Sequence, residues 1–285
     1  MISRRRTRYG TPISAATLER IRATLRAALN EAVREDVIGD NPARGLRLPS
    51  PRHVHPVVWT ARRVALWQRT GERPAVAVWT PEQLAEFLAF VREDRLFVLW
   101  WLIALRGLRR GEAAGLRWVD LDSERRELII TRQVVRTPDG LRACPPKSEA
   151  SLRNVALDRE TLRLLRHHER LQKRELGQSW SPAGSMFTGR GGAGVDPNFL
   201  THRFHTLVAA SGLPPIRLHD LRHGAATLAL AAGDDLRVVQ GLLGHASIVV
   251  TADIYASVLP QLYHDSARIS PSVSSSTGTY GDGVP

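Results

Sequence analysis

One apolar run, Leu96 to Leu105, constrains the fold more than any other feature of the sequence. Its ten residues read LFVLWWLIAL. A helix that crosses a bilayer needs about 20 apolar residues, so this run is too short for a membrane span. We therefore expect a helix buried in the core of a globular domain. The basic N-terminus, MISRRRTRYG, is not followed by an apolar segment, so we expect no secretory signal.

The composition favours a globular chain with a polyanionic partner. Hydrophobic residues make up 43% of the 285 residues, which is enough for a core, and the formal net charge is +12. So basic a chain favours nucleic acid or an anionic membrane surface as partner, although a soluble protein can be basic without one. Cys144 is the only cysteine, which excludes an internal disulfide and a thiolate metal cluster. We expect a cytoplasmic protein.

The choice of basic residues draws attention to one lysine. Of the 40 Lys and Arg residues, only Lys147 and Lys173 are lysines. Arginine holds its proton too tightly to act as an acid near neutral pH, whereas lysine releases one when its pKa is lowered. Lys147 is therefore a candidate for proton transfer, while chance explains Lys173 equally well.

Most of the positive charge lies at the N-terminus. Residues 1–73 contain 15 basic and 6 acidic residues, a net charge of +9, and the rest of the chain adds +3. Residues 11–36 place apolar side chains at helical spacing, with arginines on the remaining surface, among them Arg20, Arg22 and Arg26. We expect one helix in residues 1–50, followed by a partly ordered linker over residues 51–79.

Residues 80–265 have the pattern of a mainly α domain with one small antiparallel sheet. Thr80, Pro81 and Gln83 form a helix-start signature, in which the threonine and the glutamine cap each other's backbone. Further on, the sequence predicts helices to about residue 105 and to about residue 118, strands over 127–136 and up to 157, and then helices interrupted by a loop at 178–194. We expect residues 266–285 to be a disordered tail.

Four separated segments carry candidate chemistry. They are GLRRGE at 107–112, the hairpin that contains Lys147, LHDLRH at 218–223 and LLGHASIVVTADIY at 242–255. Together they resemble the catalytic signature of the tyrosine recombinases and phage integrases, over about residues 80–260. The signature's residues fall in order on Arg109, Lys147, His219 with Arg222, His245 and Tyr255. Each piece alone is common, but the ordered set is specific.

These residue types suit an attack on a phosphodiester. Negative charge grows on the equatorial oxygens during the attack, and guanidinium groups stabilise it with paired hydrogen bonds. We expect Arg109 and Arg222 in this role. His219 and Arg222 are three residues apart and share a helix face, and His245 would add another donor. Taken singly, either histidine could equally be structural.

Tyr255 is the candidate nucleophile. A tyrosine hydroxyl, with a pKa of about 10, needs a base or positive surroundings to attack, and His219 could accept its proton. The resemblance places Lys147 on a β-hairpin, as the acid that protonates the leaving 5' oxygen. Glu112 resembles the family's carboxylate that orients an arginine or histidine; otherwise it is a charge at a helix start.

The resemblance also implies an activity, a fold and partners. The activity is site-specific DNA recombination, the integration or excision of a mobile element, through a 3'-phosphotyrosyl bond and with no metal or other cofactor. The fold is the catalytic domain of DNA breaking and rejoining enzymes, preceded by a helical core-binding domain. The partners are double-stranded DNA, which Arg110 and the N-terminal arginines would bind, and further copies of the chain in a tetramer on synapsed DNA. The chain alone is expected to be a monomer or weak oligomer, at the nucleoid and not at a membrane.

The N-terminus departs from the family pattern. Family members usually carry an arm-binding domain and a bundle of core-binding helices, whereas here we expect a single helix in a partial core-binding segment. A lone helix cannot bury its apolar face. We expect the grip on DNA to rest on phosphate contacts, with Arg20, Arg22 and Arg26 taking part, and to discriminate weakly between sequences.

Three other interpretations stay open. A metal site could draw on His202 with His205 or His219 with His223, but no HExxH motif, second cysteine or carboxylate cluster completes it. A type IB topoisomerase shares the chemistry, although the LLGH motif and the loop lengths resemble integrases more. A catalytically inactive or truncated integrase remnant that only binds DNA is the third, and the presence of every catalytic residue type argues against it.

Overall fold

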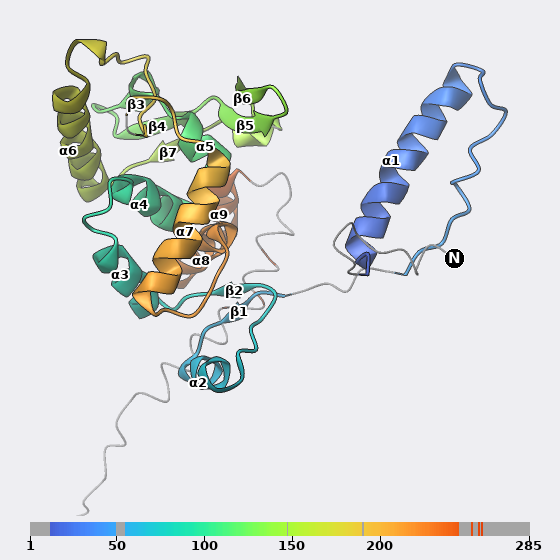
Figure 1. The fold of residues 1–285 in the computed structure, drawn as a ribbon, viewed down its shortest axis with the longest axis horizontal. Helices are drawn as coiled ribbons and strands as arrows, with labels where there is room; N and C mark the ends of the chain where they lie inside the picture. The colour runs from blue at the N-terminus through green and yellow to red at the C-terminus, as the bar shows by residue number, and fades with distance from the viewer. Residues whose placement is uncertain are drawn as a thin grey trace, which may run out of the picture. The chain divides into compact units, whose positions relative to one another are not determined.

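The computed structural model describes residues 12–49, 55–146, 148–189 and 191–244, together with residues 252, 256 and 258. The chain divides into two compact units, Met1–Val54 and His55–Pro285. The predicted mainly α fold is confirmed in the second unit (Figure 1), but in place of the one small antiparallel sheet that we expected, the described residues form two antiparallel sheets and a parallel pair of short strands. One large apolar core and a smaller apolar cluster lie within this unit. None of the helices in the described residues is long and apolar enough to cross a membrane.

The first unit contains helix α1 (Ala15–Arg34) and a segment that returns along it. The helix begins at Ser14, whose Oγ accepts a hydrogen bond from the Thr17 N–H (3.2 Å). The buried side chain of Asn41 ties the returning segment to the helix by donating to the Arg26 carbonyl (3.0 Å). Within this unit Ile21 and Leu25 stay exposed, as expected of a helix with little to pack against.

The second unit begins with residues that we expected to form a linker. Strand β1 (Val57–Val58) pairs with strand β2 (Ala77–Val78), and helix α2 (Ala61–Thr70) connects them. The pair is parallel, which the sequence did not predict. Trp59 and Trp79, at the ends of these strands, are buried in the main core. Their burial explains why residues 55–79 pack on the rest of the second unit despite a composition rich in Pro, Arg and His.

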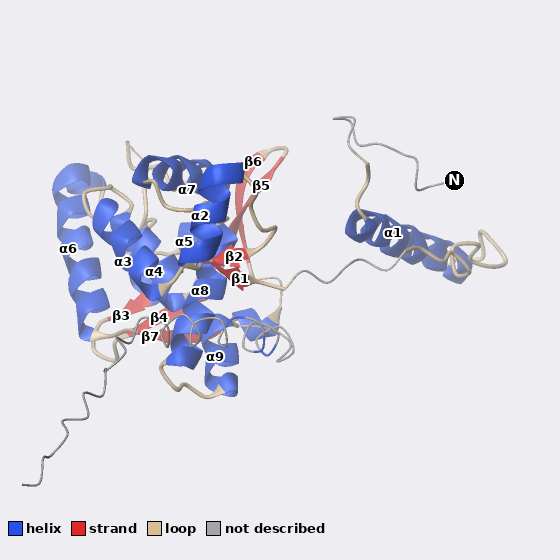
Figure 2. Ribbon diagram, turned by 90° about the horizontal axis from the view of Figure 1, so that it is seen from below, coloured by secondary structure: helices blue, strands red, loops and turns tan. Residues whose placement is uncertain are grey.

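The apolar run forms the centre of the core, as predicted. Helix α3 (Pro81–Phe90) starts with the expected capping box, in which Thr80 Oγ1 accepts from the Gln83 N–H (3.3 Å) and Gln83 Oε1 from the Thr80 N–H (3.0 Å). The predicted helical run breaks before helix α4 (Phe97–Arg106), where Asp94 Oδ1 accepts from the Leu96 N–H (2.9 Å). Helix α4 contacts α3, α5, α6 and α8, and Figures 1 and 2 show it between these helices.

Two antiparallel sheets follow. After helix α5 (Arg110–Gly115) and the short helix η2 (Trp118–Asp120), one sheet has the order β3-β4-β7, and the other is the hairpin β5-β6. The single strand predicted over 127–136 is therefore two strands in different sheets. The bounds of the strands and of the turn between them are β3 (Leu121–Asp122), β4 (Glu127–Ile130), β5 (Gln133–Thr137), β6 (Gly140–Cys144), η3 (Glu149–Ser151) and β7 (Arg153–Ala156).

The C-terminal half of the unit is helical, as predicted. Helix α6 (Arg159–Leu176) and the short helix η4 (Gly177–Ser179) precede the expected loop, which leads into helix α7 (Pro197–Ser211). Helices α8 (Leu218–Ala231) and α9 (Leu236–Leu243) complete the described fold, together with the buried Val258. The predicted tail, residues 266–285, lies outside the described residues.

Candidate active site

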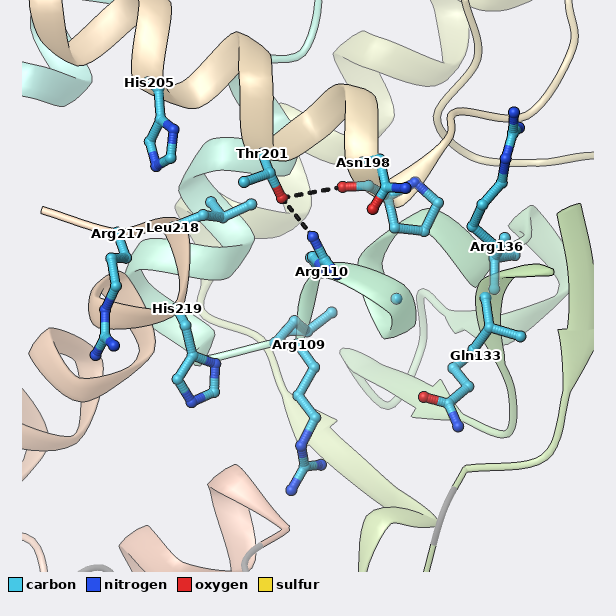
Figure 3. A pocket seen from close by; sticks show the side chains of 15 residues that line it. Arg109, Arg110, Gln133, Arg136, Asn198, Thr201, His205, Arg217, Leu218 and His219 are labelled. Atoms are coloured by element: carbon cyan, nitrogen blue, oxygen red, sulfur yellow. Dashed lines mark hydrogen bonds between the residues drawn. The ribbon is translucent and has the colours of Figure 1, made fainter. Parts of the chain in front are cut away.

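An open cleft of about 790 Å³ lies between the start of α5, strand β5, helix α7 and the start of α8 (Figure 3). Its described lining contains no aspartate or glutamate. The basic side chains that line it are Arg109, Arg110, Arg136, Arg217, His205 and His219. Such a surface attracts a polyanion and raises its local concentration.

Two of the predicted catalytic residues lie in this cleft. In Figure 3 the side chains of Arg109 and His219 extend in the same direction, from α5 and α8 respectively. Arg110, which we predicted to bind DNA, also faces the cleft, where its Nη1 donates to Thr201 Oγ1 (2.6 Å). Because the hydroxyl is neutral, this contact leaves the positive charge of Arg110 available to an anion.

Arg109 is held by a buried carboxylate. Its Nη1 donates to Glu112 Oε1 (2.6 Å) and to Ser151 Oγ (3.2 Å), and its backbone N–H donates to Glu112 Oε2 (2.9 Å). Its Nη2 donates to the Gly244 carbonyl (2.8 Å). The side chain nevertheless remains 32% exposed, whereas that of Glu112 is 1% exposed. Glu112 thus lies against Arg109, and its orienting role stays a prediction.

Arg153 is a site residue that the sequence analysis missed. It projects from β7, and its Nη2 donates to Glu112 Oε2 (2.9 Å), opposite Arg109. Its Nε donates to the Leu242 carbonyl (2.7 Å), and the side chain is only 6% exposed. The sequence offers one weak signal, a charged residue next to a predicted buried strand, and 38 arginines conceal it.

The two arginines keep Glu112 ionised. Burial by itself would raise the pKa of this carboxyl group. The hydrogen bonds and charge of Arg153, together with the hydrogen bonds from Arg109, outweigh burial and lower the pKa below its ordinary value. One carboxylate therefore serves two guanidinium groups.

Arg222 lies behind the cleft. The side chain is almost completely buried, and its Nη1 and Nη2 donate to the carbonyls of Gly107 and Leu243, at the C-terminal ends of α4 and α9. Burial and the positive charges of Arg109 and Arg153 lower the pKa of Arg222 to about 9, so the side chain is charged at neutral pH. Gly107 has a left-handed φ of 63°, and a Cβ there would also press on the end of the Leu243 side chain, so this position favours glycine.

His219 is exposed to the cleft, while its ring is backed by protein. The rings of His219 and His223 have centroids 5.1 Å apart at an angle of 87°. Burial of the inner side of the ring, followed by the charges of His223 and Arg222, lowers the pKa of His219 to about 4. The ring is therefore neutral at physiological pH and has a nitrogen without a proton, although so low a pKa also makes it a weak base.

The structure does not describe the other predicted site residues within this arrangement. Lys147, His245 and Tyr255 lie outside the described residues. Arg20, Arg22 and Arg26 belong to the first unit, where Arg20 is exposed and Arg22 is paired with Glu19 (2.7 Å). Among the residues that the structure describes, no group of three His, Cys, Asp or Glu side chains is placed to hold a metal ion.

Comparison with known proteins identifies the family. Residues 78–261 match the family model described as the phage integrase family. The chain belongs to this family. A tyrosine recombinase XerC from Mycobacterium sp. (strain KMS) is 32% identical over 238 residues, which cover 82% of this chain and 70% of that protein.

More distant relatives extend the comparison. An ICEBs1 integrase from Bacillus subtilis is 26% identical, over 88% of this chain and 64% of the relative, and a XerC-like tyrosine recombinase from Caldanaerobacter subterraneus subsp. tengcongensis is 27% identical. The chain spans 64% of the length of each of these two relatives. A solved structure of the Tn1549 transposon integrase with transposon right end DNA shares the fold, with a TM-score of 0.65, 22% identity and coverage of 90% of this chain and 80% of that chain.

The Arg153–Glu112 pair yields a prediction about stability. Arg153→Met leaves a buried carboxylate with one partner fewer, which should lower the free energy of unfolding at pH 7 by about 3–5 kcal/mol. The loss should shrink as the pH falls toward 4, because protonation of Glu112 removes the unpaired charge. Urea unfolding at several pH values measures both effects.

A double variant and a surface pair serve as controls. Glu112→Gln combined with Arg153→Met should recover part of the loss, since no buried carboxylate then lacks a partner and the charge of Arg109 is partly exposed to solvent. Arg163→Met, which breaks the exposed pair between Arg163 and Glu160, should change stability little. Equal losses from Arg153→Met and Arg163→Met would contradict the prediction.

The lowered pKa of His219 predicts its charge state. At pH 5.5 an ordinary histidine, with a pKa of about 6.5, is mostly charged, whereas His219 should stay neutral. Because the unfolded chain then binds the extra proton, His219 should make stability rise as the pH rises from about 4 to about 6.5. Ring nitrogen shifts in NMR, assigned with His219→Gln, measure this pKa, and a value near 6.5 would refute the prediction.

Proposed function

We propose that this chain is a tyrosine-type site-specific DNA recombinase, which integrates or excises a mobile element by breaking and rejoining double-stranded DNA. One observation carries the proposal: an arginine cluster built on a single buried carboxylate opens, through Arg109, onto a basic cleft that also holds the neutral His219. Positive charge and a proton acceptor in one cleft are what a hydroxyl attack on a phosphodiester needs.

The relatives support the mobile-element part of the proposal. Three of them are called ICEBs1 integrase, putative prophage phiRv2 integrase and Tn1549 transposon integrase, names that refer to elements that move between DNA sites. The XerC relative is named a tyrosine recombinase. These names describe those proteins, and membership of the same family extends the expectation to this chain.

The proposed reaction conserves the energy of the broken bond. The Tyr255 hydroxyl oxygen attacks the phosphorus and forms a 3'-phosphotyrosyl bond, while the bond from phosphorus to the 5' oxygen breaks. The tyrosine proton passes to neutral His219, and Lys147 protonates the leaving 5' oxygen. Attack by a 5'-hydroxyl of the partner strand reverses these steps and rejoins the DNA, so the reaction needs no ATP, metal or other cofactor.

The arginines would stabilise the charge on phosphorus oxygens. Arg109 is partly exposed and can exchange its bond to the Gly244 carbonyl for a phosphate oxygen. A guanidinium carries more N–H groups than the two bonds that hold Arg222 to carbonyls, but this side chain is 1% exposed, so contact between Arg222 and the same phosphate stays a prediction. In the proposal His245 supplies a further donor.

The residues next to Lys147 and His245 in the sequence support the assignment of both to the active site. Ser148, which follows Lys147, lies 3.0 Å from Ser151 between hydroxyl oxygens, and Ser151 contacts Arg109. Gly244, which precedes His245, accepts a hydrogen bond from Arg109 through its carbonyl. The described residues beside the proposed lysine and histidine are therefore both linked to Arg109 by hydrogen bonds.

The proposal includes the partners expected from the sequence. Double-stranded DNA would bind along the basic cleft through Arg110, and Arg20, Arg22 and Arg26 of the first unit would add phosphate contacts. Recombination of two duplexes calls for a tetramer on the synapsed DNA. We place this activity at the nucleoid, in the cytoplasm. A catalytically inactive DNA-binding remnant remains the alternative, and the next experiment separates the two.

Tyr255→Phe tests the nucleophile. The variant should form no covalent adduct with a nicked suicide substrate, because only the attacking oxygen is removed, and its affinity for the DNA should change within about threefold. Denaturing gel electrophoresis detects the adduct. Tyr263→Phe is the matched control and should form it at the normal rate. An adduct formed by Tyr255→Phe would overturn the assignment, and no adduct from the unsubstituted chain would favour the inactive remnant.

Lys147→Ala tests the general acid. Cleavage should slow by about a hundredfold or more, which is typical of the loss of a proton donor, while binding is retained. A 5'-phosphorothiolate substrate, whose sulfur leaves without a proton, should restore the rate, which is followed by adduct formation. Lys173 is paired with Glu169 (2.7 Å) on the surface of α6, so Lys173→Ala should cleave normally on both substrates. Rescue of Lys173→Ala, and not of Lys147→Ala, would assign the general acid to Lys173.

A further inference from the structure

The start of the second unit is an internal repeat with an offset of 20 residues. Val58-Trp59-Thr60 recurs as Val78-Trp79-Thr80, and helices α2 (61–70) and α3 (81–90) follow at the same distance and with the same length. Each copy is therefore a short strand, a tryptophan, a threonine at the helix start and a ten-residue helix.

The two copies share part of their contacts, although Thr80 caps its helix with its side chain and Thr60 does not. Val58 pairs with Val78 in the parallel register of β1 and β2. Each tryptophan packs against the aromatic residue eight positions later: Trp59 against Trp67 at 5.9 Å and Trp79 against Phe87 at 5.0 Å between ring centroids. Gln83 Nε2 links the copies by donating to the Trp59 carbonyl (3.0 Å).

Both tryptophans reach the segment that leads into helix α8. Trp79 Nε1 donates to the Pro214 carbonyl (2.8 Å), and Trp59 Nε1 donates to the Pro215 carbonyl (3.2 Å). Helix α8 starts at Leu218, and His219 is its second residue. Two successive carbonyls, just before the helix that carries His219 and Arg222, are thus fixed by two equivalent indoles.

The valines on the other face of β1 and β2 pack against the middle of helix α8. Val58 and Val78 are fully buried and belong to one apolar cluster with Ala226 and Leu230 of α8. Alternate residues of a strand point to opposite faces. Strands β1 and β2 therefore contact α8 with the valines and the segment before it with the tryptophans.

Ordinary core packing does not require this arrangement. A buried tryptophan usually finds a partner for its N–H, but the partner can lie anywhere. Trp100 donates to Asp94 Oδ1 (3.1 Å) and Trp118 to Gln172 Oε1 (2.6 Å), both outside the cleft. The repeat instead directs both of its indoles to the start of α8.

We propose that Trp59 and Trp79 are positioning residues, which fix the start of α8 and so hold His219 in the cleft. The inference rests on the proposed function, because His219 acts there on the tyrosine proton. Loss of either indole N–H should loosen the first turn of α8 and slow the chemical step, with little effect on DNA binding.

Trp79→Phe and Trp59→Phe in the full chain test the proposal, with Trp118→Phe as the matched control that loses an equally buried indole hydrogen bond elsewhere. Loss of one such bond should speed amide hydrogen exchange over residues 216–224 by about fivefold. Cleavage of saturating suicide DNA should slow by about tenfold, because the acceptor is misplaced, with affinity within about threefold. Trp118→Phe should leave the exchange over 216–224 and the cleavage rate within about twofold of the unsubstituted chain.

The two measurements separate the possible failures. If the unsubstituted chain does not cleave DNA, the proposed function fails, and hydrogen exchange still decides whether the indoles fix α8. Unchanged exchange, equal changes in Trp118→Phe, or faster exchange with an unchanged cleavage rate would each overturn the positioning role. If Trp79→Phe does not fold, Trp59→Phe, whose hydrogen bond is longer, carries the same test.

Discussion

One buried guanidinium, that of Arg222, joins two helix ends, and the site depends on this contact. Its terminal nitrogens bind the Gly107 carbonyl after α4 and the Leu243 carbonyl at the end of α9. Each helix C-terminus carries about half a negative charge, so two of them together offset about one positive charge. This explains how Arg222 stays charged in the core without a carboxylate partner among the described ion pairs. The glycines at both helix ends have a φ of 63°, which lets the two ends meet around the arginine.

The carboxylate of Glu112 partly neutralises the positive charge in the rest of the site. It binds Arg109 and Arg153 at once, and these arginines also donate to the last carbonyls of α9, at Gly244 and Leu242. The end of α9 is thus held by three arginines from α5, β7 and α8. A change at any one of them disturbs the same end of α9, and Arg109 and Arg153 also share Glu112, so single substitutions here should not be additive.

Local patterns predicted the parts of this site that lie close in sequence. Arg109 and Glu112 are one helical turn apart, and the structure joins them by hydrogen bonds. His219 and Arg222 are also one turn apart, but His219 lines the cleft whereas Arg222 is buried. Arg153 lies 41 residues from Glu112, and no local pattern marks that contact. Residues 55–79 looked like a linker because the partners of Trp59 and Trp79 are carbonyls 156 and 135 residues away. Such tertiary contacts override a local composition rich in Pro and Arg.

The balance of charge indicates where a phosphate would bind. The two helix ends offset Arg222, and Glu112 offsets one of its two arginines, which leaves about one positive charge in excess. Arg153 is 6% exposed and Arg109 32% exposed, so the excess is accessible at Arg109, in the cleft. A phosphodiester carries one negative charge and gains more as it is attacked. A site whose donors are fixed before substrate arrives stabilises that added charge without reorganising, and in the proposed function Arg109, held by Glu112, would supply this property.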